Sequence, residues 1–222
     1  MPLKTNFILT CNLSTWDATS AGSIELPPPN YRVVEIHSIE DKAFYLLNEF
    51  CMQMGYPVKW AGQMLGFGAI AVLVLHQKNN GPTVSESVAG YSYLTGKPFR
   101  VGEVRGLFDP SPDGDYYFGD FVQHEHRGHG LQRLLIRQRL SISKQLGRQY
   151  AYAMTNNTIP RSVQNYKSVG FTISKLICVR QVLRFEITSI KSQEPGLKSG
   201  RLHIDGIQLP MGYGLRRISG LR

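Results

Sequence analysis

A strand that runs through a short glycine loop into a long helix is the feature that most limits how this sequence can fold. The strand is predicted over YYFGDFV (residues 116–122), and the loop is RGHG (residues 127–130). From Leu131 to Gly147 the apolar residues recur at roughly helical spacing, which predicts an amphipathic helix ending near the glycine. A strand and an amphipathic helix joined this way bury their apolar surfaces against each other, so we expect an α/β fold.

Strand-like and helix-like segments alternate through the centre of the chain. Further strands are predicted over residues 31–38, 68–77, 88–94, 150–155 and 171–187, and further helices over residues 42–55 and 159–169. The pair Asn80-Gly81 is typical of a tight turn, which indicates an antiparallel hairpin around it. The sequence therefore predicts a mixed, mostly antiparallel central sheet flanked by helices.

Three regions are expected along the chain. Residues 1–30 show no clear period and end in LPPPN, so we expect an irregular N-terminal arm. Residues 31–187 hold the alternating elements and form the predicted domain. Residues 188–222 form a C-terminal extension rich in glycine and basic residues, in which residues 203–209 indicate one more strand.

Charge and cysteine content narrow the function classes. With 25 basic and 16 acidic residues the net charge is +9, which favours an anionic partner: nucleic acid, a membrane surface or a phosphate-bearing cofactor. Three cysteines without a CxxC pair predict neither a disulfide framework nor a structural zinc site. The longest apolar run, residues 64–75, is too short to cross a bilayer and is typical of a buried strand. We expect a cytoplasmic protein without membrane contact.

The histidines of VQHEHRGHG raise the question of a metal site. A zinc-binding helix of the protease type needs two histidines four residues apart, but the fourth residue after His124 is Gly128, and His129 falls one position late. His126 could join His124 from an extended segment, yet no second cluster of Cys, His or carboxylates supplies the remaining ligands. No metal is predicted.

An anion explains the same loop better. The first N–H groups of a helix have no partners within the helix and carry the positive end of its dipole. Gly128 and Gly130 let the backbone approach a bulky anion, while Arg127 and Arg133 add positive charge. These features favour a diphosphate at the start of the helix, although neither a Rossmann fingerprint nor a P-loop is present.

The loop RGHGLQ resembles the Q/R-x-x-G-x-G/A signature of the GNAT superfamily of N-acetyltransferases, which use acyl-coenzyme A. Val122, five residues before Arg127, matches a further position of that pattern. A second pattern of the family is matched at its usual spacing by Ser162, Tyr166 and the pair Gly170-Phe171. The resemblance covers roughly residues 31–187 and includes the order of the elements.

This resemblance implies that acetyl-CoA lies where two strands, those of residues 116–122 and 150–155, splay apart. The residues it assigns to the coenzyme are Phe121, Val122, Arg127, Gly128, His129, Gly130, Leu131, Gln132, Asn157 and Tyr166. Two positions depart from the family pattern. Gln132 replaces a small residue, and Ile159 stands where an asparagine is common, so Asn156 or Asn157 would have to take over its role.

The resemblance also suggests catalytic residues. Tyr166 is the candidate general acid that protonates the departing thiolate. Asp120 is the candidate base, since strand alternation places it on the same face as Val122, with Tyr116 further along that face. His124, Glu125 and a water relay remain alternatives for the base.

The expected activity is transfer of an acetyl group from acetyl-CoA to a primary amine in a ternary complex. One alternative is a coenzyme-binding protein of the same fold without catalysis, and a weaker one is a basic nucleic-acid-binding protein. The acceptor stays open among small amines, amino-acid-like metabolites and protein N-termini. Acidic residues are sparse in residues 44–65 and scattered in 97–115, which disfavours a strongly cationic acceptor such as an aminoglycoside. A homodimer is also left open.

Overall fold

The computed structural model describes residues 4–17, 27–80, 83–104, 106–110, 112–182, 185–192, 201–204, 207–209 and 213–217. The helices are α1 (Phe44–Gln53), α2 (Trp60–Gly66), α3 (Leu131–Gln145) and α4 (Pro160–Ser168), with short 3-10 turns η1 (Gly102–Val104) and η2 (His124–His126). The strands are β1 (Lys4–Asn12), β2 (Tyr31–Ile36), β3 (Ile70–Asn80), β4 (Thr83–Thr95), β5 (Phe99–Val101), β6 (Gly106–Asp109), β7 (Gly114–Val122), β8 (Tyr150–Asn156), β9 (Thr172–Val182), β10 (Phe185–Ser192), β11 (Arg201–Ile204), β12 (Ile207–Leu209) and β13 (Tyr213–Arg217).

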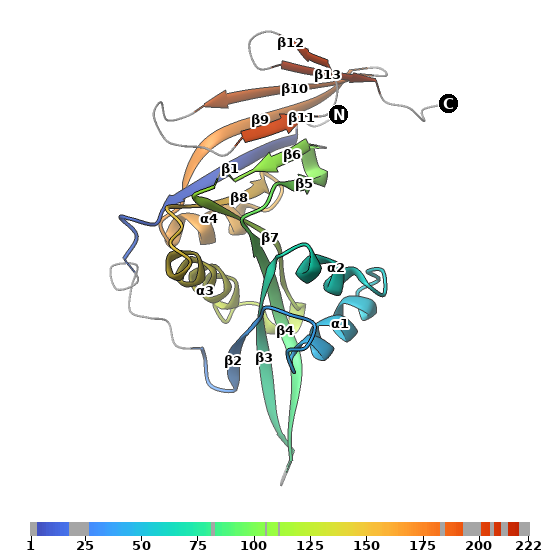
Figure 1. Ribbon diagram of the computed structural model, residues 1–222, viewed down its shortest axis with the longest axis vertical. Coiled ribbons are helices and arrows are strands. Elements are labelled where there is room, and N and C mark those ends of the chain that lie inside the picture. Colours follow the sequence, from blue (N-terminus) through green and yellow to red (C-terminus); the bar gives the residue numbers. More distant parts are fainter. Residues whose placement is uncertain are drawn as a thin grey trace.

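Ten strands form one open sheet in the order β12-β13-β10-β9-β1-β8-β7-β4-β3-β2, and β11-β6-β5 form a second, small sheet (Figure 1). In the described part of the chain every strand pair is antiparallel except β7 with β8, which is parallel. The predicted mixed, mostly antiparallel sheet is confirmed. The predicted hairpin is confirmed as β3–β4, although Gly81 itself lies outside the described residues.

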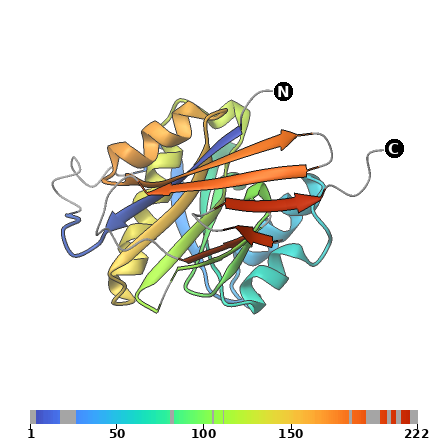
Figure 2. The ribbon, with the colours of Figure 1, turned by 90° about the horizontal axis from the view of Figure 1, so that it is seen from above.

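Helices pack on both faces of the large sheet, and the described residues form three apolar clusters, one of which contains Tyr116 and Tyr152. Figures 1 and 2 show α3 and α4 on one face and α1 and α2 on the other. Under α3 and α4 the core contains Leu135, Tyr166 and Phe171. Under α1 and α2 it contains Leu47 and Tyr91. Since α3 buries one stripe against the sheet, its position fixes where the preceding loop meets the strand ends.

The N-terminal segment differs from the prediction. An irregular arm over residues 1–30 is wrong for Lys4–Asn12, because β1 lies inside the sheet between β8 and β9. Leu9 is completely buried, and Thr10 donates a buried hydrogen bond from its hydroxyl to Ser174 at 2.8 Å. Because this strand has polar residues at buried positions, it lacks the regular apolar pattern from which strands are predicted.

Three smaller segments also differ. Helix α2 occupies the start of the apolar run predicted as a strand, and β3 begins only at Ile70. Strand β10 crosses position 187, so the large sheet continues into the predicted extension. Within residues 203–209 the structure has two strands, β11 and β12, which belong to different sheets.

In the parts of the chain that the structure describes, no helix is long and apolar enough to span a membrane.

Candidate active site

A bulge in β7 shapes the site. Gly119 has φ 67°, and the pairing of β7 with β4 shifts register between Tyr91 and Tyr93. The extra residue restarts the alternation of side chains, as a bulge does. Asp120 therefore faces α3, as does Val122, whereas Tyr116 packs in the core on the opposite side of the sheet. The prediction that Tyr116 shares the face of Asp120 is wrong for this reason.

β7 and β8 separate just before the bulge. Their parallel pairing ends at Tyr117 with Ala153, although β7 continues to Val122 and β8 to Asn156. The predicted splay of these two strands is confirmed. It opens the sheet at the end where α3 begins.

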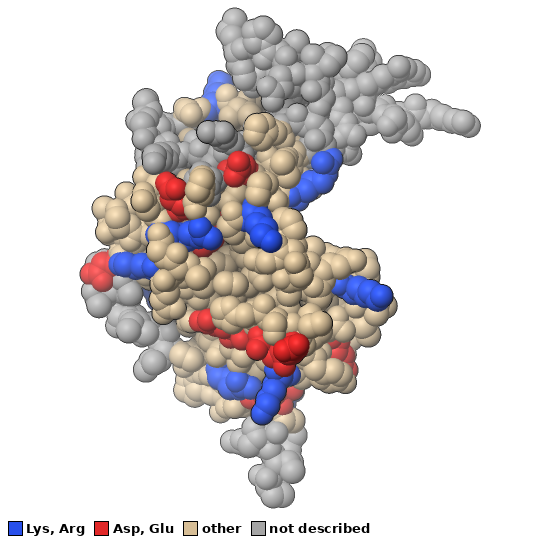
Figure 3. Space-filling view, viewed as in Figure 1, with Lys and Arg blue, Asp and Glu red and all other residues tan. Residues whose placement is uncertain are grey.

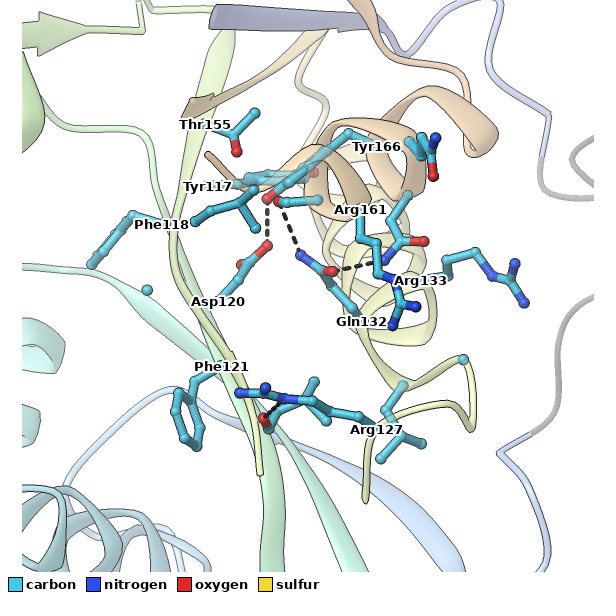
Figure 4. A pocket seen from close by; sticks show the side chains of 18 of the residues that line it. Tyr117, Phe118, Asp120, Phe121, Arg127, Gln132, Arg133, Thr155, Arg161 and Tyr166 are labelled. Atoms are coloured by element: carbon cyan, nitrogen blue, oxygen red, sulfur yellow. Dashed lines mark hydrogen bonds between the residues drawn. The ribbon is translucent and has the colours of Figure 1, made fainter. Parts of the chain in front are cut away.

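A pocket of about 780 Å³ occupies this opening (Figure 4). This volume lies in the range of cofactor and small-molecule sites. Nine of the residues predicted from the sequence line it together: Asp120, Phe121, Val122, Arg127, Gly128, Gly130, Leu131, Gln132 and Tyr166. The structure thus brings the two sequence motifs to one cavity.

Two predicted coenzyme residues are not among those that line the pocket. His129 is exposed, and its Nδ1 lies 3.3 Å from the carbonyl oxygen of His126. Asn157 is bound to β1, because its N–H donates to the carbonyl of Thr5 at 3.0 Å and its side-chain oxygen accepts from the N–H of Thr5 at 3.3 Å. Asn156 lines the pocket instead.

The glycine loop presents bare backbone to the pocket. Gly128 has φ 89°, and a Cβ placed on it would meet nothing within 4 Å. Gly130 has φ 76° and is the N-cap of α3, with no side-chain cap on the helix. Because no side chain satisfies the first N–H groups of α3, they are available to an anion.

Side-chain contacts of the loop refine two of the predicted roles. Arg127 donates from Nε to the carbonyl oxygen of Val122 at 3.2 Å, so it folds over the end of β7. Gln132 connects α3 to α4: its Nε2 donates to the hydroxyl of Ser162 at 3.2 Å, and its Oε1 accepts from Asn165 at 2.7 Å (Figure 4). The large residue at position 132 is thereby held against α4.

The two predicted catalytic residues meet at the inner end of the pocket. The hydroxyl of Tyr166 donates to Oδ2 of Asp120 at 2.6 Å (Figure 4). Oδ1 of the same carboxylate lies 2.7 Å from Nη1 of Arg139, whose Nη2 donates to the Tyr166 hydroxyl at 3.2 Å. Asp120, Arg139 and Tyr166 therefore form a closed triangle of hydrogen bonds and charge.

Burial sets the protonation of this triangle. It raises the pKa of Tyr166 well above its ordinary value, although the positive charge of Arg139 acts in the opposite direction. For Arg139 burial lowers the pKa, but Asp120, Tyr166 and Tyr117 together outweigh burial, so the pKa is raised. The phenol is thus protonated and the guanidinium charged at neutral pH.

Arg139 is the residue of this site that the sequence reading missed. It is one of several basic residues between positions 123 and 150, yet it is completely buried. Its position in the sequence indicates burial. Arg139 follows Leu135 by four residues and precedes Ile142 by three, which puts it on the apolar stripe of the helix. A charge on a buried stripe needs a partner.

Of the three histidines of the loop, only His126 is buried, and it lines the pocket. The ring of His126 lies 4.8 Å from that of His76, and its Nδ1 is 3.0 Å from the hydroxyl of Tyr31. Burial, followed by the neighbouring His76, lowers the pKa of His126. Across the described residues, no group of three or more His, Cys, Asp or Glu could hold a metal ion.

Comparison with known proteins supports the fold. No protein-family model and no curated protein matches the sequence. Among solved structures, one similar chain is a tandem GNAT protein from the clavulanic acid biosynthesis pathway, with a TM-score of 0.54, 14% identity and coverage of 78% of this chain and 51% of that one. Another is the GCN5-related glucosamine N-acetyltransferase region of a fungal multi-domain beta-N-acetylglucosaminidase, with a TM-score of 0.56, 13% identity and coverage of 78% and 20%.

The present chain thus spans about half or less of the length of these two proteins. The likeness covers 78% of this chain in both cases and concerns the fold. The chain has the fold of the GNAT superfamily of acetyltransferases.

Proposed function

We propose that this protein is an N-acetyltransferase that moves an acetyl group from acetyl-CoA to a primary amine in a ternary complex. The observation that carries the proposal is the pocket itself, in which the glycine loop, the splayed strand and Tyr166 line one cavity. An anion site next to a buried acid is what transfer from a diphosphate-bearing thioester needs.

The residues of the pocket fit acetyl-CoA as the acyl donor. The backbone of Gly128 and Gly130 and the first turn of α3 would hold the diphosphate. Main-chain groups of Phe121 and Val122 would bind the pantetheine arm in the splay and polarise the thioester carbonyl. The contacts of Gln132 with α4 leave the side of the loop near Gly128 open.

Tyr166 is the proposed general acid. Its phenol is buried and protonated, and it lines the pocket at the end of the splay. It can give its proton to the sulfur that leaves the thioester. Asp120 stays a candidate base, but both oxygens of its carboxylate are already engaged, one by Tyr166 and the other by Arg139. The pair favours a role for Asp120 in orienting the phenol.

The test is release of free thiol from acetyl-CoA with a panel of amines. The unchanged chain is expected to turn over at least one amine, and Tyr166→Phe is expected to lower kcat by about 10²–10⁴-fold with little change in coenzyme affinity. Ser143→Ala is the control, since it removes buried hydrogen bonds between α3 and β7, to Asp115 (2.7 Å) and Tyr117 (2.9 Å), without touching Tyr166. An unchanged kcat in Tyr166→Phe would remove Tyr166 from the mechanism.

A coenzyme-binding protein without catalysis is the second candidate, favoured by the hydrogen bond that directs the Tyr166 proton to Asp120 rather than into the pocket. Binding of acetyl-CoA without thiol release for any amine would select it.

A further inference from the structure

We propose that Arg139 is a positioning residue that aims the phenol of Tyr166 and supports the negative charge left on it during proton transfer. This inference rests on the proposed acetyltransferase function and assigns a role to a side chain that does not line the pocket. It is carried by the contacts of one buried guanidinium.

The guanidinium of Arg139 is held by four different elements. Its Nε donates to the carbonyl of Leu135 in α3 at 3.3 Å, and its Nη1 donates to the carbonyl of Tyr93 in β4 at 3.2 Å. The same Nη1 pairs with Asp120 on the bulge of β7, and Nη2 reaches Tyr166 in α4. Its central carbon also lies 4.6 Å from the centre of the Tyr117 ring. A side chain fixed at so many points has one orientation.

This arrangement determines where the hydrogen of Tyr166 points. A guanidinium has only donors, so the phenol oxygen must accept from Arg139 and direct its own hydrogen elsewhere. Asp120 is the acceptor, at 2.6 Å. Arg139 and Asp120 therefore set the rotation of the phenol hydroxyl between them, next to the cavity.

In the chemical step the hydroxyl of Tyr166 turns its hydrogen from Asp120 to the sulfur, while Arg139 keeps the phenol oxygen in place. When the amine nitrogen bonds to the acetyl carbon and the carbon–sulfur bond breaks, the sulfur leaves with the electron pair, and Tyr166 gives it the phenol proton. The resulting phenolate lies between the Asp120 carboxylate and the Arg139 guanidinium, whose positive charge offsets the repulsion from the carboxylate. The proton that the new amide nitrogen loses restores the phenol, so the proton count closes without another reactant.

A purely structural role for Arg139 makes a different prediction, because a structural residue acts on the whole fold and not through Tyr166. A double-mutant cycle of Arg139→Lys and Tyr166→Phe separates the two roles. Lysine keeps the charge but cannot make the forked contacts of the guanidinium. The measurements are kcat and KM for acetyl-CoA, with thermal unfolding to establish that each variant is folded.

We expect Arg139→Lys to lower kcat by about tenfold or more in the chain that has Tyr166, while KM for acetyl-CoA changes by less than about threefold. In the Tyr166→Phe chain the same substitution should change kcat by less than about twofold, since the group it acts through is gone. The control Ser143→Ala should change kcat by the same factor in both backgrounds.

The inference is overturned if Arg139→Lys lowers kcat equally in both backgrounds or leaves kcat unchanged. If Arg139→Lys does not fold, the cycle is repeated with Asp120→Asn and Arg139→Met combined, because removing both charges avoids an unpaired buried ion. That chain should bind acetyl-CoA and have a low kcat. Adding Tyr166→Phe to it should lower kcat by less than about twofold more. A full further loss on Tyr166→Phe would overturn the inference.

Failure of the proposed function gives a separate result. In that case the unchanged chain releases no thiol with any amine and is not stabilised by acetyl-CoA, and the role of Arg139 is overturned with it. If the chain is active but Arg139→Lys lowers kcat by the same factor in both backgrounds, only the proposed role of Arg139 is overturned.

Discussion

Gly128 and Gly147 lie at opposite ends of α3 with similar backbone conformations, φ 89° and φ 73°, and neither has an atom within 4 Å of where a Cβ would stand. Alanine at either position adds the same kind of strain, about 1–2 kcal/mol of unfolding free energy. Only Gly128 lines the pocket. We therefore expect Gly128→Ala to weaken acetyl-CoA binding about tenfold or more, and Gly147→Ala to leave it unchanged.

Urea unfolding and calorimetric titration with acetyl-CoA measure the two effects on the same pair of variants. Equal affinities in Gly128→Ala and Gly147→Ala would mean that the coenzyme does not approach this loop.

His126 makes the stability of the fold depend on pH. Burial and the neighbouring His76 hold its pKa below the ordinary value of 6.5, with smaller effects from Glu125, Lys78 and His129. Above pH 6.5 both the folded and the unfolded chain carry a neutral imidazole here, so the group adds no pH dependence. As pH falls below 6.5 the unfolded chain takes up the proton first, and the folded state loses stability.

Unfolding free energies measured from pH 7.5 down to pH 5 are expected to fall more steeply for the unchanged chain than for His126→Gln. Parallel curves for the two chains would show that His126 is not held neutral in the fold.

At the scale of elements, the sequence prediction and the structure disagree on β1. Leu9 is fully buried in this strand, so Leu9→Ala should cost about 2–5 kcal/mol of unfolding free energy. Leu146, at the end of α3, is 52% exposed, and Leu146→Ala should cost less than about 0.5 kcal/mol. Chemical denaturation measures the unfolding free energy of both variants. An unchanged unfolding free energy in Leu9→Ala would contradict the buried strand β1 and favour the irregular arm instead.

Which elements could be predicted depended on how regularly their buried faces are apolar. Helix α3 was predicted from its start because its leucines and isoleucines recur at helical spacing. Strand β1 was not, because it is buried on both faces and carries Asn6 and Thr10 at buried positions. Helix α2 has Gly62 within its seven residues and ends at Gly66, which weakens the helical signal.

The candidate site divides in the same way. Its lining was predictable because motif residues such as Gly128, Gly130 and Tyr166 have fixed spacing along the chain. The contact of Arg139 with Asp120 was not, since it depends on the bulge at Gly119 and on the packing of α3 over β7. Tertiary geometry of this kind leaves only a trace in the sequence, here a charge on an apolar stripe.

At the scale of the whole molecule, the net charge of +9 raises the question of where the basic residues lie. On the face shown in Figure 3, lysines and arginines alternate with aspartates and glutamates. Arg32 is paired with Glu86 and Arg148 with Asp115, while Arg139 is buried, so these charges do not form a free basic surface. On this face the described residues form no continuous basic stripe of the kind that nucleic-acid binding needs.

Thermal unfolding with each ligand decides between the two kinds of anionic partner. At about 100 times its Kd, acetyl-CoA should stabilise the fold by about 2.7 kcal/mol through mass action, which raises Tm by roughly 5–10 °C for a chain of this size. Duplex DNA at physiological salt should leave Tm unchanged, because phosphate contacts need free basic groups along one surface. A Tm that rises with DNA and falls steeply as salt is added, together with no response to acetyl-CoA, would overturn the acetyltransferase proposal, since the pocket could not then be a coenzyme site.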